Sequence, residues 1–463
     1  MSRIPVILIF DVGKTNKKLL VFDQQYNIVH EESLKLEEIK DEDDFACEDV
    51  QSLTEWIKSS FEKLLIDGRF HIKAVNFSAY GASFVYLNEY GEIIMPLYNY
   101  LKPFPKKLQD KFYKTYGGES LVAKQTASPV LGNLNSGMQL YRMKYEKPDL
   151  FKKIKFALHL PQYLSYILSG KLNSDITSIG CHTNLWHFQQ RQYHKWVKQE
   201  EIIEKLPSTL SCTEIAGKVN KEICIGAGLH DSSSALIPYL STFKEPFILL
   251  STGTWCISLN PFNHSQLSDY ELDHDCLCYL SYEGKPVKAS RLFAGYEHEQ
   301  QVKRLAAHFN KPEDYYTSVK ADMAIISKIK KGKKDILKKQ QTPMVAQSLF
   351  TKRKLDEFEN YEAAYHQLIC DITDQQVRST NIVLKGTDVK KIFVDGGFSK
   401  NPIYMNLMAS SFPGIEIYAA SIARASALGA ALVIHSKWNS LTIPREMIEL
   451  KLYKASNAEN IIA

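Results

Sequence analysis

The chain has 463 residues, which is too long for one ordinary hydrophobic core and predicts two domains with a cleft between them. Hydrophobic residues make up 44% and charged residues 24%, values that exclude a disordered or fibrous protein. The formal net charge of +5 is small for this length, so neither a nucleic acid nor an anionic membrane is indicated as a partner.

The first apolar run, residues 6–10, meets Asp11 before it is long enough for a signal peptide or a membrane span. Eight cysteines are spread along the chain without a disulfide framework, which is typical of thiols kept reduced in the cytosol. We therefore expect a cytoplasmic protein. Residues 273–278 combine Asp, His and Cys side chains, but their spacing fits no common zinc site, and alternation along a strand or loop explains them better.

Two strand-like apolar segments, residues 7–10 and 19–22, flank a polar turn that contains a glycine. The same pattern returns in the second half of the chain, where residues 246–250 and 255–260 flank the short turn 251–254. The sequence therefore predicts two hairpins, each opening one half of the chain.

Helical and strand-like segments follow each hairpin. Amphipathic residues 49–65 predict a helix, and residues 72–77 predict the strand after it. Both halves are therefore predicted to be mixed α/β domains, the first comprising residues 1–241 and the second residues 242–463.

The hairpin tips suit polyphosphate, because free backbone N–H groups and small side chains can approach anionic oxygens closely. An ordinary turn is the simpler explanation for either tip alone, but two tips favour a cradle. Gly13-Lys14-Thr15 does not complete a P-loop, since that motif needs a glycine where Leu8 stands and a helix where residues 19–22 are strand-like. A dinucleotide fingerprint is also absent at this turn, which disfavours a hydride-transfer enzyme.

Near the C-terminus, residues 391–401 predict a strand, paired glycines and then a helix from Pro402. Such a turn admits a flat ring or a phosphate, although a tight strand-to-helix connection explains it equally well. Residues 360–384 predict a packing helix, and residues 423–432 a helix with a small-residue face. The lysine-rich stretch 328–339 is most simply a solvated face, and we assign it no function.

Taken together, five motifs resemble, in order and spacing, those of the FGGY carbohydrate kinases: Asp11-Val-Gly-Lys-Thr15 with Lys18, Gly228-Leu-His-Asp231, Ser251-Thr-Gly-Thr-Trp255, Asp395-Gly-Gly397 with Asn401, and Ser426-Ala-Leu-Gly429. Residues 79–87, 134–141 and 160–170 are similar to segments of the L-rhamnulose and L-fuculose kinases. The resemblance implies two duplicated actin-like domains of the ribonuclease H-like, hexokinase type around an interdomain cleft.

The resemblance also implies roles for individual residues. Phosphoryl transfer to a sugar needs a carboxylate to accept the hydroxyl proton, Mg²⁺ and donors to the phosphates of ATP. The matching residues are Asp231 as the base, Asp11 for Mg²⁺, Thr15, Lys18, Gly253 and Thr254 for phosphate, Gly396, Gly397 and Asn401 for the nucleotide, and Gly81, Asn135 and His230 for the sugar.

The chain departs from the rhamnulose-kinase pattern on the sugar side. Tyr80, Ala82 and Ser83 stand where tryptophan, valine and aspartate are expected, which removes a carboxylate from a hydroxyl-reading position. Arg424 stands where the family often has glutamate, and residues 99–103 replace a basic residue. The sugar and the hydroxyl are therefore left open.

Three hypotheses follow. The first is an ATP- and Mg²⁺-dependent kinase for a (deoxy)ketose such as L-rhamnulose or L-fuculose, or for another ketose or polyol. The second is a nucleotide-gated protein of the actin and chaperone type. The third is a glycoside hydrolase with Asp231 and Asp175 as its carboxylate pair. The expected partner is a small sugar, and a homodimer is left open.

Overall fold

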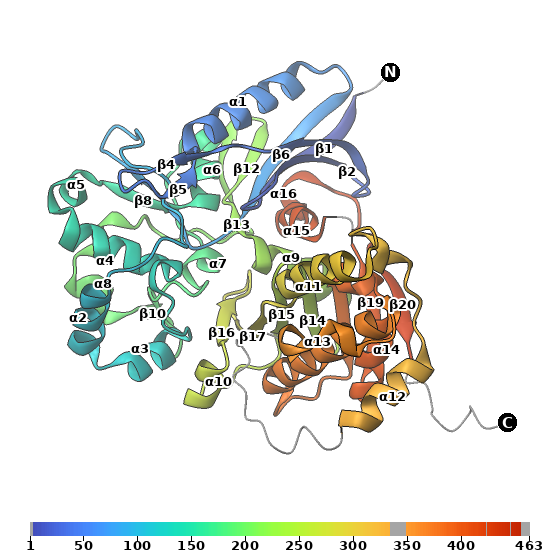
Figure 1. Cartoon of the computed structure of the whole chain (residues 1–463). Helices are drawn as coiled ribbons and strands as arrows, with labels where there is room; N and C mark the ends of the chain where they lie inside the picture. The colour runs from blue at the N-terminus through green and yellow to red at the C-terminus, as the bar shows by residue number, and fades with distance from the viewer. Residues whose placement is uncertain (1–2, 334–348, 423, 445, 455–463) are drawn as a thin grey trace.

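The computed structural model describes residues 3–333, 349–422, 424–444 and 446–454. Two α/β domains lie side by side, with the N-terminal half in the upper and left part of Figure 1 and most of the C-terminal half in the lower right. Each domain is built on one seven-stranded mixed sheet. The predicted pair of similar domains is therefore present.

The first sheet has its N-terminal hairpin near the middle. Its strand order is β11-β12-β6-β1-β2-β3, and β13 pairs with β6. β1 runs antiparallel to β2 but parallel to β6, and β6 runs parallel to β12. The strands are β1 (Ile4–Val12), β2 (Lys17–Asp23), β3 (Ile28–Leu34), β6 (Phe70–Ala79), β11 (Ile215–Val219), β12 (Ile223–Gly226) and β13 (Leu229–His230).

The second sheet repeats this pattern with the order β16-β17-β15-β14-β18-β19-β20. β14 runs antiparallel to β15 and parallel to β18, and β18 runs parallel to β19, as β1, β2, β6 and β12 do in the first sheet. The strands are β14 (Phe247–Thr252), β15 (Cys256–Asn260), β16 (Cys276–Leu280), β17 (Pro286–Leu292), β18 (Lys391–Gly396), β19 (Glu416–Ser421) and β20 (Glu449–Tyr453).

Helices pack on both faces of the first sheet, so the side chains of β1 are buried on both of its faces. Val6 and Leu8 share a core with Ile57 of α1 (Val50–Ile66), whereas Ile7 and Ile9 share another with α9 (Asp231–Thr242) and α15 (Ala425–Val433). This double burial is the reason that the strand reads as a continuous apolar run. α1 begins at the Asp49 cap and confirms the helix predicted at residues 49–65.

Two of the remaining helices, at residues 160–169 and 435–438, also pack on the first sheet. The others cover the second sheet or build a lobe beside the first sheet, and the core of this lobe contains Phe112, Tyr141 and Trp196. All the remaining helices are α2 (Lys106–Tyr116), α3 (Glu119–Thr126), α4 (Ser136–Glu146), α5 (Pro148–Lys153), α6 (Leu160–Ser169), α7 (Ile176–Ile179), α8 (Lys195–Gln199), α10 (Asp269–Asp273), α11 (Ala294–Phe309), α12 (Met323–Lys333), α13 (Tyr361–Leu384), α14 (Pro402–Ser411) and α16 (His435–Trp438). α13 confirms the packing helix predicted at residues 360–384, with Asn360 as its cap.

Short elements complete the chain. Three small antiparallel pairs are β4 (Glu38–Lys40) with β5 (Ala46–Glu48), β7 (Phe84–Leu87) with β8 (Phe156–His159), and β9 (Trp186–His187) with β10 (Gln192–Tyr193). The 3₁₀ turns are η1 (Gly132–Leu134), η2 (Ile202–Lys205), η3 (Tyr315–Ser318), η4 (Leu349–Lys352), η5 (Leu355–Glu357) and η6 (Gly397–Lys400).

α15 and α16 return from the second half of the chain to the first sheet (Figure 1). α15 packs tightly on α9: a Cβ on Gly429 would lie 1.9 Å from the backbone oxygen of Ser234. The Asn76 side chain of β6 donates to the Ala430 carbonyl at 2.8 Å. The small-residue face of α15 therefore joins the two domains by packing on α9 and β6.

Two further predictions concern the surface of the chain. Within the described ranges, none of the helices is long and apolar enough to cross a membrane. The lysine-rich stretch begins in α12, and its residues 334–339 lie outside the described part of the chain.

Candidate functional site

Asp231 is the first residue of α9 and directly follows β13. Its Oδ1 accepts a 2.6 Å hydrogen bond from the Ser232 N–H and lies 3.2 Å from His230 Nε2. Burial raises the pKa of Asp231 to about 6, while the bonds from Ser232 oppose the rise. The side chain is 33% exposed, so this half-buried carboxylate at the helix start can be reached by a substrate. A carboxylate with this pKa is ionised near pH 7 and can accept a proton.

The small residues before Asp231 are required by the backbone. Gly228 has φ +77°, and a Cβ there would lie 2.3 Å from the Pro161 carbonyl oxygen. A Cβ on Gly226 would lie 2.2 Å from Asn76 Oδ1, and that oxygen accepts from the Gly228 N–H. The run before Asp231 is thus a close crossing of β12, β6 and α6 that fixes where α9 begins.

His230 lies against two residues of the predicted sugar side. Its Nε2 is 3.1 Å from Cys181 Sγ, and a Cβ on Gly81 would lie 3.0 Å from its Cδ2 atom. The Tyr279 ring of β16 is 5.5 Å away between centroids. Burial lowers the pKa of His230 to about 3, so the imidazole is neutral and has one N–H to donate. Gly81 and His230 are therefore brought together, whereas Cys181 and Tyr279 carried no motif in the sequence.

Asp11 is the penultimate residue of β1 and lies opposite Lys18 of β2. Ser426 of α15 donates a 2.8 Å hydrogen bond to its Oδ2. Burial raises the pKa of Asp11 to about 6; the Ser426 bond lowers it, and the negative charge of Asp231 raises it again. The two predicted acidic residues thus lie close enough for their charges to interact, although they come from opposite ends of the first domain.

Two cations near Asp11, Lys18 and Arg424, are linked through the carboxylate of Glu31. Lys18 Nζ lies 3.8 Å from Glu31 Oε1, and Arg424 Nη2 lies 2.8 Å from the same oxygen. Arg424 caps the start of α15 with a left-handed φ of +60°. Thr15 is exposed in the β1–β2 turn, which the Gly13 N–H closes onto the Asn16 carbonyl. This turn therefore presents backbone and a hydroxyl to solvent, groups that a phosphate loop would use.

The second turn lies between β14 and β15, and Gly253 and Thr254 are exposed in it. The Gly253 carbonyl packs against α11 so closely that a Cβ on Gly295 would lie 1.8 Å from its oxygen. Gly396 has φ +92°, and its Cβ would lie 2.1 Å from the Thr252 carbonyl oxygen. Backbone packed on backbone fixes this turn, which explains why glycines recur here.

A cavity of about 590 Å³ opens beside this second turn. Gly253, Gly397 and Asn401 line it, together with residues that no motif marked: Gly295, His298, Tyr316, Thr317, Val319, Tyr365, Phe398, Lys400 and Pro402. Its size is that of a small-molecule site. Three of the predicted nucleotide residues therefore share one cavity, and Gly396 directly precedes one of them, Gly397.

Aromatic rings form one wall of this cavity. The His298 ring lies 5.0 Å from Tyr316 and 5.3 Å from Phe398 between centroids, and its Nε2 is 3.1 Å from the Tyr365 hydroxyl. Asn401 donates to that hydroxyl at 2.8 Å and also caps α14. Burial lowers the pKa of His298 to about 4, so a neutral ring faces the cavity. Such a wall accommodates a flat, uncharged ring.

Asn135 is placed differently from the other predicted residues. It is fully buried, and its amide donates to Ser128 Oγ at 2.9 Å and to the His182 carbonyl at 2.8 Å. Its Oδ1 accepts from the Leu131 N–H at 2.7 Å. Both amide protons are thus bound within the protein, and the geometry makes Asn135 a support for its loop.

The residues near Gly81 that differ from the rhamnulose-kinase pattern are also in contact with protein atoms. The Tyr80 hydroxyl donates to Glu48 Oε2 at 2.7 Å. Ala82 has a left-handed φ of +64°, and the Ser83 hydroxyl points to the Tyr98 carbonyl at 3.3 Å. All three residues are buried. Their side chains shape the backbone around Gly81.

Two other acidic candidates have structural roles. Asp175 is buried and caps α7, accepting a 2.8 Å bond from the Thr177 N–H, and the Thr177 hydroxyl accepts from the His230 N–H. Asp175 is therefore not a second carboxylate open to the cleft. Asp275, in the segment with metal-like composition, forms a two-point ion pair with the buried Arg291.

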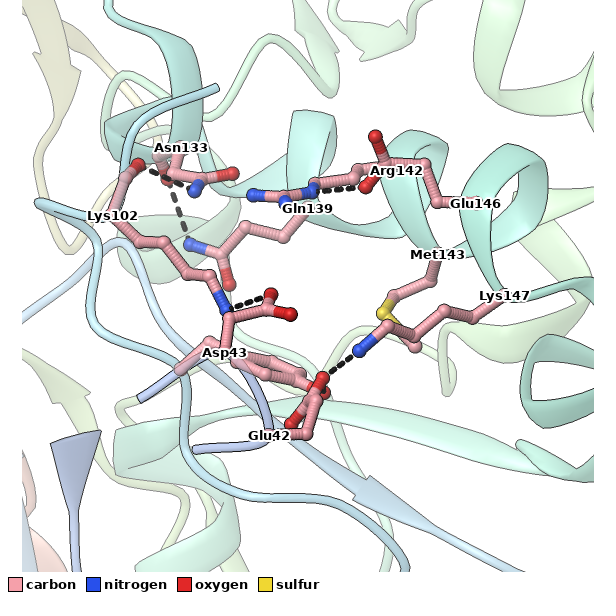
Figure 2. A pocket seen from close by; sticks show the side chains of 10 residues that line it. Glu42, Asp43, Lys102, Asn133, Gln139, Arg142, Met143, Glu146 and Lys147 are labelled. Atoms are coloured by element: carbon pink, nitrogen blue, oxygen red, sulfur yellow. Dashed lines mark hydrogen bonds and ion pairs between the residues drawn. The ribbon is translucent and has the colours of Figure 1, made fainter. Parts of the chain in front are cut away.

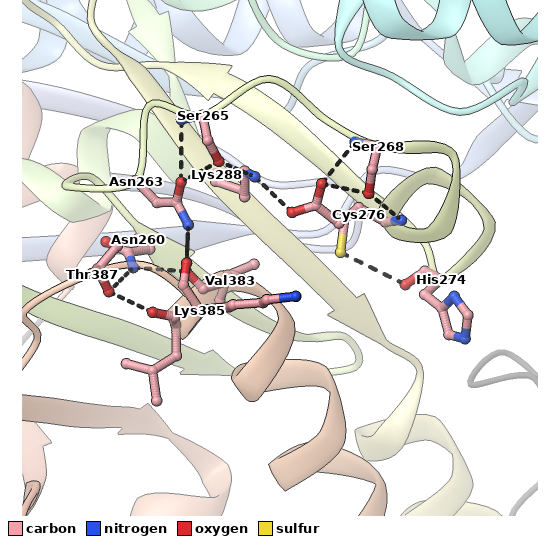
Figure 3. Close-up of polar contacts among 12 residues, drawn as sticks. Asn260, Asn263, Ser265, Ser268, His274, Cys276, Lys288, Val383, Lys385 and Thr387 are labelled. Carbon is pink, nitrogen blue, oxygen red and sulfur yellow. Dashed lines mark hydrogen bonds and ion pairs between the residues drawn. The ribbon is translucent and has the colours of Figure 1, made fainter.

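The cysteines of that segment are strand residues, as expected. Cys276 and Cys278 are both buried in β16, and Figure 3 shows the Cys276 sulfur facing the backbone oxygen of His274. The nearby Lys288 ammonium is bound to Ser265 at 2.7 Å and to Glu271 at 2.6 Å. In the described part of the chain, no group of three or more His, Cys, Asp or Glu side chains is arranged for a metal ion.

Known proteins share this architecture. Residues 6–235 match the N-terminal domain of the FGGY family of carbohydrate kinases, and residues 244–442 match the carbohydrate kinase FGGY C-terminal domain. The rhamnulokinase of Halalkalibacterium halodurans is 25% identical over 272 residues, which cover 54% of this chain and 55% of that protein. This chain thus spans about half, or less, of the length of the curated relatives it matches.

Solved structures match over nearly the whole chain. A carbohydrate kinase from Novosphingobium aromaticivorans has a TM-score of 0.80 at 18% identity, with 99% of this chain and 96% of that chain covered. A xylulose kinase from Lactobacillus acidophilus has a TM-score of 0.78 at 17% identity, covering 98% and 94%. These likenesses confirm the predicted fold class. Since the two family domains match in order and together cover most of the chain, the chain belongs to the FGGY family of carbohydrate kinases.

Proposed function

We propose that this protein transfers the γ-phosphoryl group of ATP to a hydroxyl of a small sugar, with Asp231 as the general base. The observation that carries the proposal is the proximity of two half-buried carboxylates, Asp231 and Asp11, at the junction of the domains. The aromatic cavity beside Gly253 supports a nucleotide site. Family membership supports the kinase over a glycoside hydrolase or a nucleotide-gated protein.

In the proposed reaction, a sugar hydroxyl donates its proton to Asp231 as its oxygen attacks the γ-phosphorus. The bond from that phosphorus to the β-γ bridging oxygen breaks, and ADP leaves. The neutral imidazole of His230 orients the sugar through a hydrogen bond. Lys18, Thr15 and the turn at Gly253 hold phosphate oxygens, so the residues supply mainly position and charge.

The acidic pair fits Mg²⁺. One or two carboxylates together with phosphate oxygens commonly hold this ion, and Asp11 is raised in pKa partly because Asp231 is near. Mg²⁺ would neutralise charge on the transferred phosphoryl group. Asp11, oriented by Ser426, is the residue proposed to hold it.

For the sugar, we propose a (deoxy)ketose such as L-rhamnulose or L-fuculose. Partial matches to rhamnulokinases support this choice, and the altered residues around Gly81 leave another ketose or polyol as the alternative. The proposal divides the chain at residue 241. The sugar contacts and the first phosphate turn, with Thr15 and Lys18, lie before it, and the second phosphate turn and the nucleotide cavity lie after it. It also places the enzyme in the cytoplasm.

ADP release, measured over a panel of ketoses and polyols, tests the function. A sugar that stimulates release supports it, and no stimulation by any of them counts against it. Asp231→Asn keeps the size of the side chain but cannot accept the proton, so we expect transfer to fall about 10³-fold or more while nucleotide binding is retained. Turnover at the wild-type rate in this variant would refute Asp231 as the base.

A further inference from the structure

A small hairpin, β4–β5, lies between the β1–β2 turn and the loop after β7. Its strands span Glu38–Lys40 and Ala46–Glu48. No motif marked this segment, yet its acidic side chains bind residues on both sides of it.

One end of the hairpin holds the β1–β2 turn. Lys14 Nζ pairs with Glu38 at 2.6 Å, and Lys17 Nζ pairs with Glu48 Oε1 at 2.5 Å. Lys17 and Glu48 side chains are each only 3% exposed, and Lys17 also donates to the Lys14 carbonyl at 3.1 Å. Lys17 and Lys18 are neighbours on a strand, so their side chains point to opposite faces of the sheet. Lys17 therefore contacts the turn from the face opposite to that of Lys18.

The same carboxylate reaches the sugar side. Glu48 Oε2 accepts the Tyr80 hydroxyl bond at 2.7 Å, and Tyr80 immediately precedes Gly81. The Tyr80 ring lies 6.0 Å from the Tyr100 ring, and burial, followed by the charge of Asp231, raises the pKa of Tyr100. Glu48 therefore has one oxygen on the phosphate turn and one on the residue beside the predicted sugar site.

The other end of the hairpin is anchored to the lobe. Figure 2 shows Lys102 beside Asp43, to which its ammonium is bound at 2.6 Å, and Lys147 paired with Glu42. Lys102 also binds the buried Asp41 at 2.6 Å. With both ends held, the hairpin cannot shift without moving the residues that Glu48 contacts.

We propose that Glu48 is a positioning residue that couples the phosphate turn, through Lys17, to the sugar side, through Tyr80. The inference rests on the proposed function, since it assigns those two sides to nucleotide and sugar. Stability alone does not explain the Lys17–Glu48 pair, because a buried ion pair adds little net stability and a hydrophobic replacement often stabilises the fold more. What the pair adds here is a fixed geometry shared by two loops.

The chain offers a matched control. Glu200 is also a buried glutamate that accepts a tyrosine hydroxyl bond, from Tyr116 at 2.6 Å, and pairs with a lysine, Lys144, at 3.0 Å. It lies in the lobe and contacts none of the predicted site residues. Glu200 also accepts a bond from the Tyr145 hydroxyl at 3.1 Å, so its replacement removes at least as many contacts as the replacement of Glu48, but away from the predicted site.

The test compares Glu48→Gln, Tyr80→Phe and their combination with Glu200→Gln and Tyr116→Phe. The affinity for a non-hydrolysable ATP analogue with Mg²⁺ is measured by calorimetry, and kcat and KM by ADP release with the best sugar. We expect Tyr80→Phe to weaken nucleotide binding about threefold to tenfold although Tyr80 lies on the sugar side, and Glu48→Gln to do the same. The double variant should be no worse than Glu48→Gln, and the Tyr116 and Glu200 variants should bind like wild type.

The outcomes separate the two proposals. Nucleotide affinity unchanged in Tyr80→Phe, or equal losses in the Glu48 and Glu200 variants, would overturn the coupling. Additive effects of Glu48→Gln and Tyr80→Phe would also overturn it. If no sugar is phosphorylated but Tyr80→Phe still weakens nucleotide binding, the sugar-kinase function fails while the coupling stands. Should Glu48→Gln fail to fold, Tyr80→Phe, which removes one oxygen atom, still decides the question.

Discussion

Ser426 Oγ donates a 2.8 Å hydrogen bond to Asp11 Oδ2 across a separation of 415 positions in the sequence. The bond joins the start of α15 to the end of β1, and it lowers the pKa of a carboxylate that burial raises to about 6. The proposed Mg²⁺ residue is therefore controlled by a hydroxyl from the other end of the chain.

Removing this hydroxyl should move the pH dependence of the enzyme. Because the Ser426 bond favours the ionised form of Asp11, Ser426→Ala should raise its pKa, and the acidic limb of kcat/KM should shift about one pH unit upward. Ser426→Thr keeps a hydroxyl and is the control. Identical pH profiles for the wild type and Ser426→Ala would show that this bond does not tune Asp11.

Asp231→Asn should stabilise the fold at neutral and basic pH. The folded pKa of about 6 lies above the ordinary 3.8, so the favourable contribution of this group is complete below its unfolded pKa and is lost as the pH rises through 6. Allowing for screening at a partly exposed side chain, the gain in unfolding free energy at pH 8 should be about 1–2 kcal/mol. Thermal unfolding without nucleotide at pH 8 and pH 4 measures it, and an advantage that persists at the lower pH would contradict the assignment.

Gly295→Ala should damage the second phosphate turn. The new Cβ would lie 1.8 Å from the Gly253 carbonyl oxygen, so the turn or the start of α11 must move. We expect nucleotide affinity to fall about tenfold or more, because backbone cannot give way as a flexible side chain does. Gly68→Ala, where nothing lies within 4 Å of the new Cβ, is the control in the same calorimetric titration. Equal affinities in the two variants would exclude this turn from the nucleotide site.

Arg424→Glu tests the departure from the family pattern. Arg424 neutralises Glu31, which also lies 3.8 Å from Lys18; a glutamate would leave two carboxylates competing for that lysine. We expect the KM for ATP to rise about threefold to tenfold at low salt and less at high salt. Lys63→Glu removes the cation that pairs with the neighbouring Glu32, at 2.8 Å, and should leave the KM nearly unchanged. A salt-independent change in Arg424→Glu would argue against this electrostatic explanation.

Features determined by local backbone were predictable. Both hairpins, the helix after Asp49 and the strand-to-helix turn at Gly396 follow from apolar periodicity and from glycines that permit close approach. The juxtaposition of Asp11 with Asp231 was expected only through the family resemblance, since no spacing rule links these positions.

Sequence by itself determined the two α/β halves, the polar tips and the family, because each depends on residues close together along the chain. Tertiary structure decided which distant side chains meet. The aromatic wall of His298, Tyr316 and Tyr365, and the contact of Glu48 with Tyr80, come from segments with no common periodicity. Such contacts arise only when sheets and helices pack, and packing depends on the summed shape of many residues rather than on any short pattern.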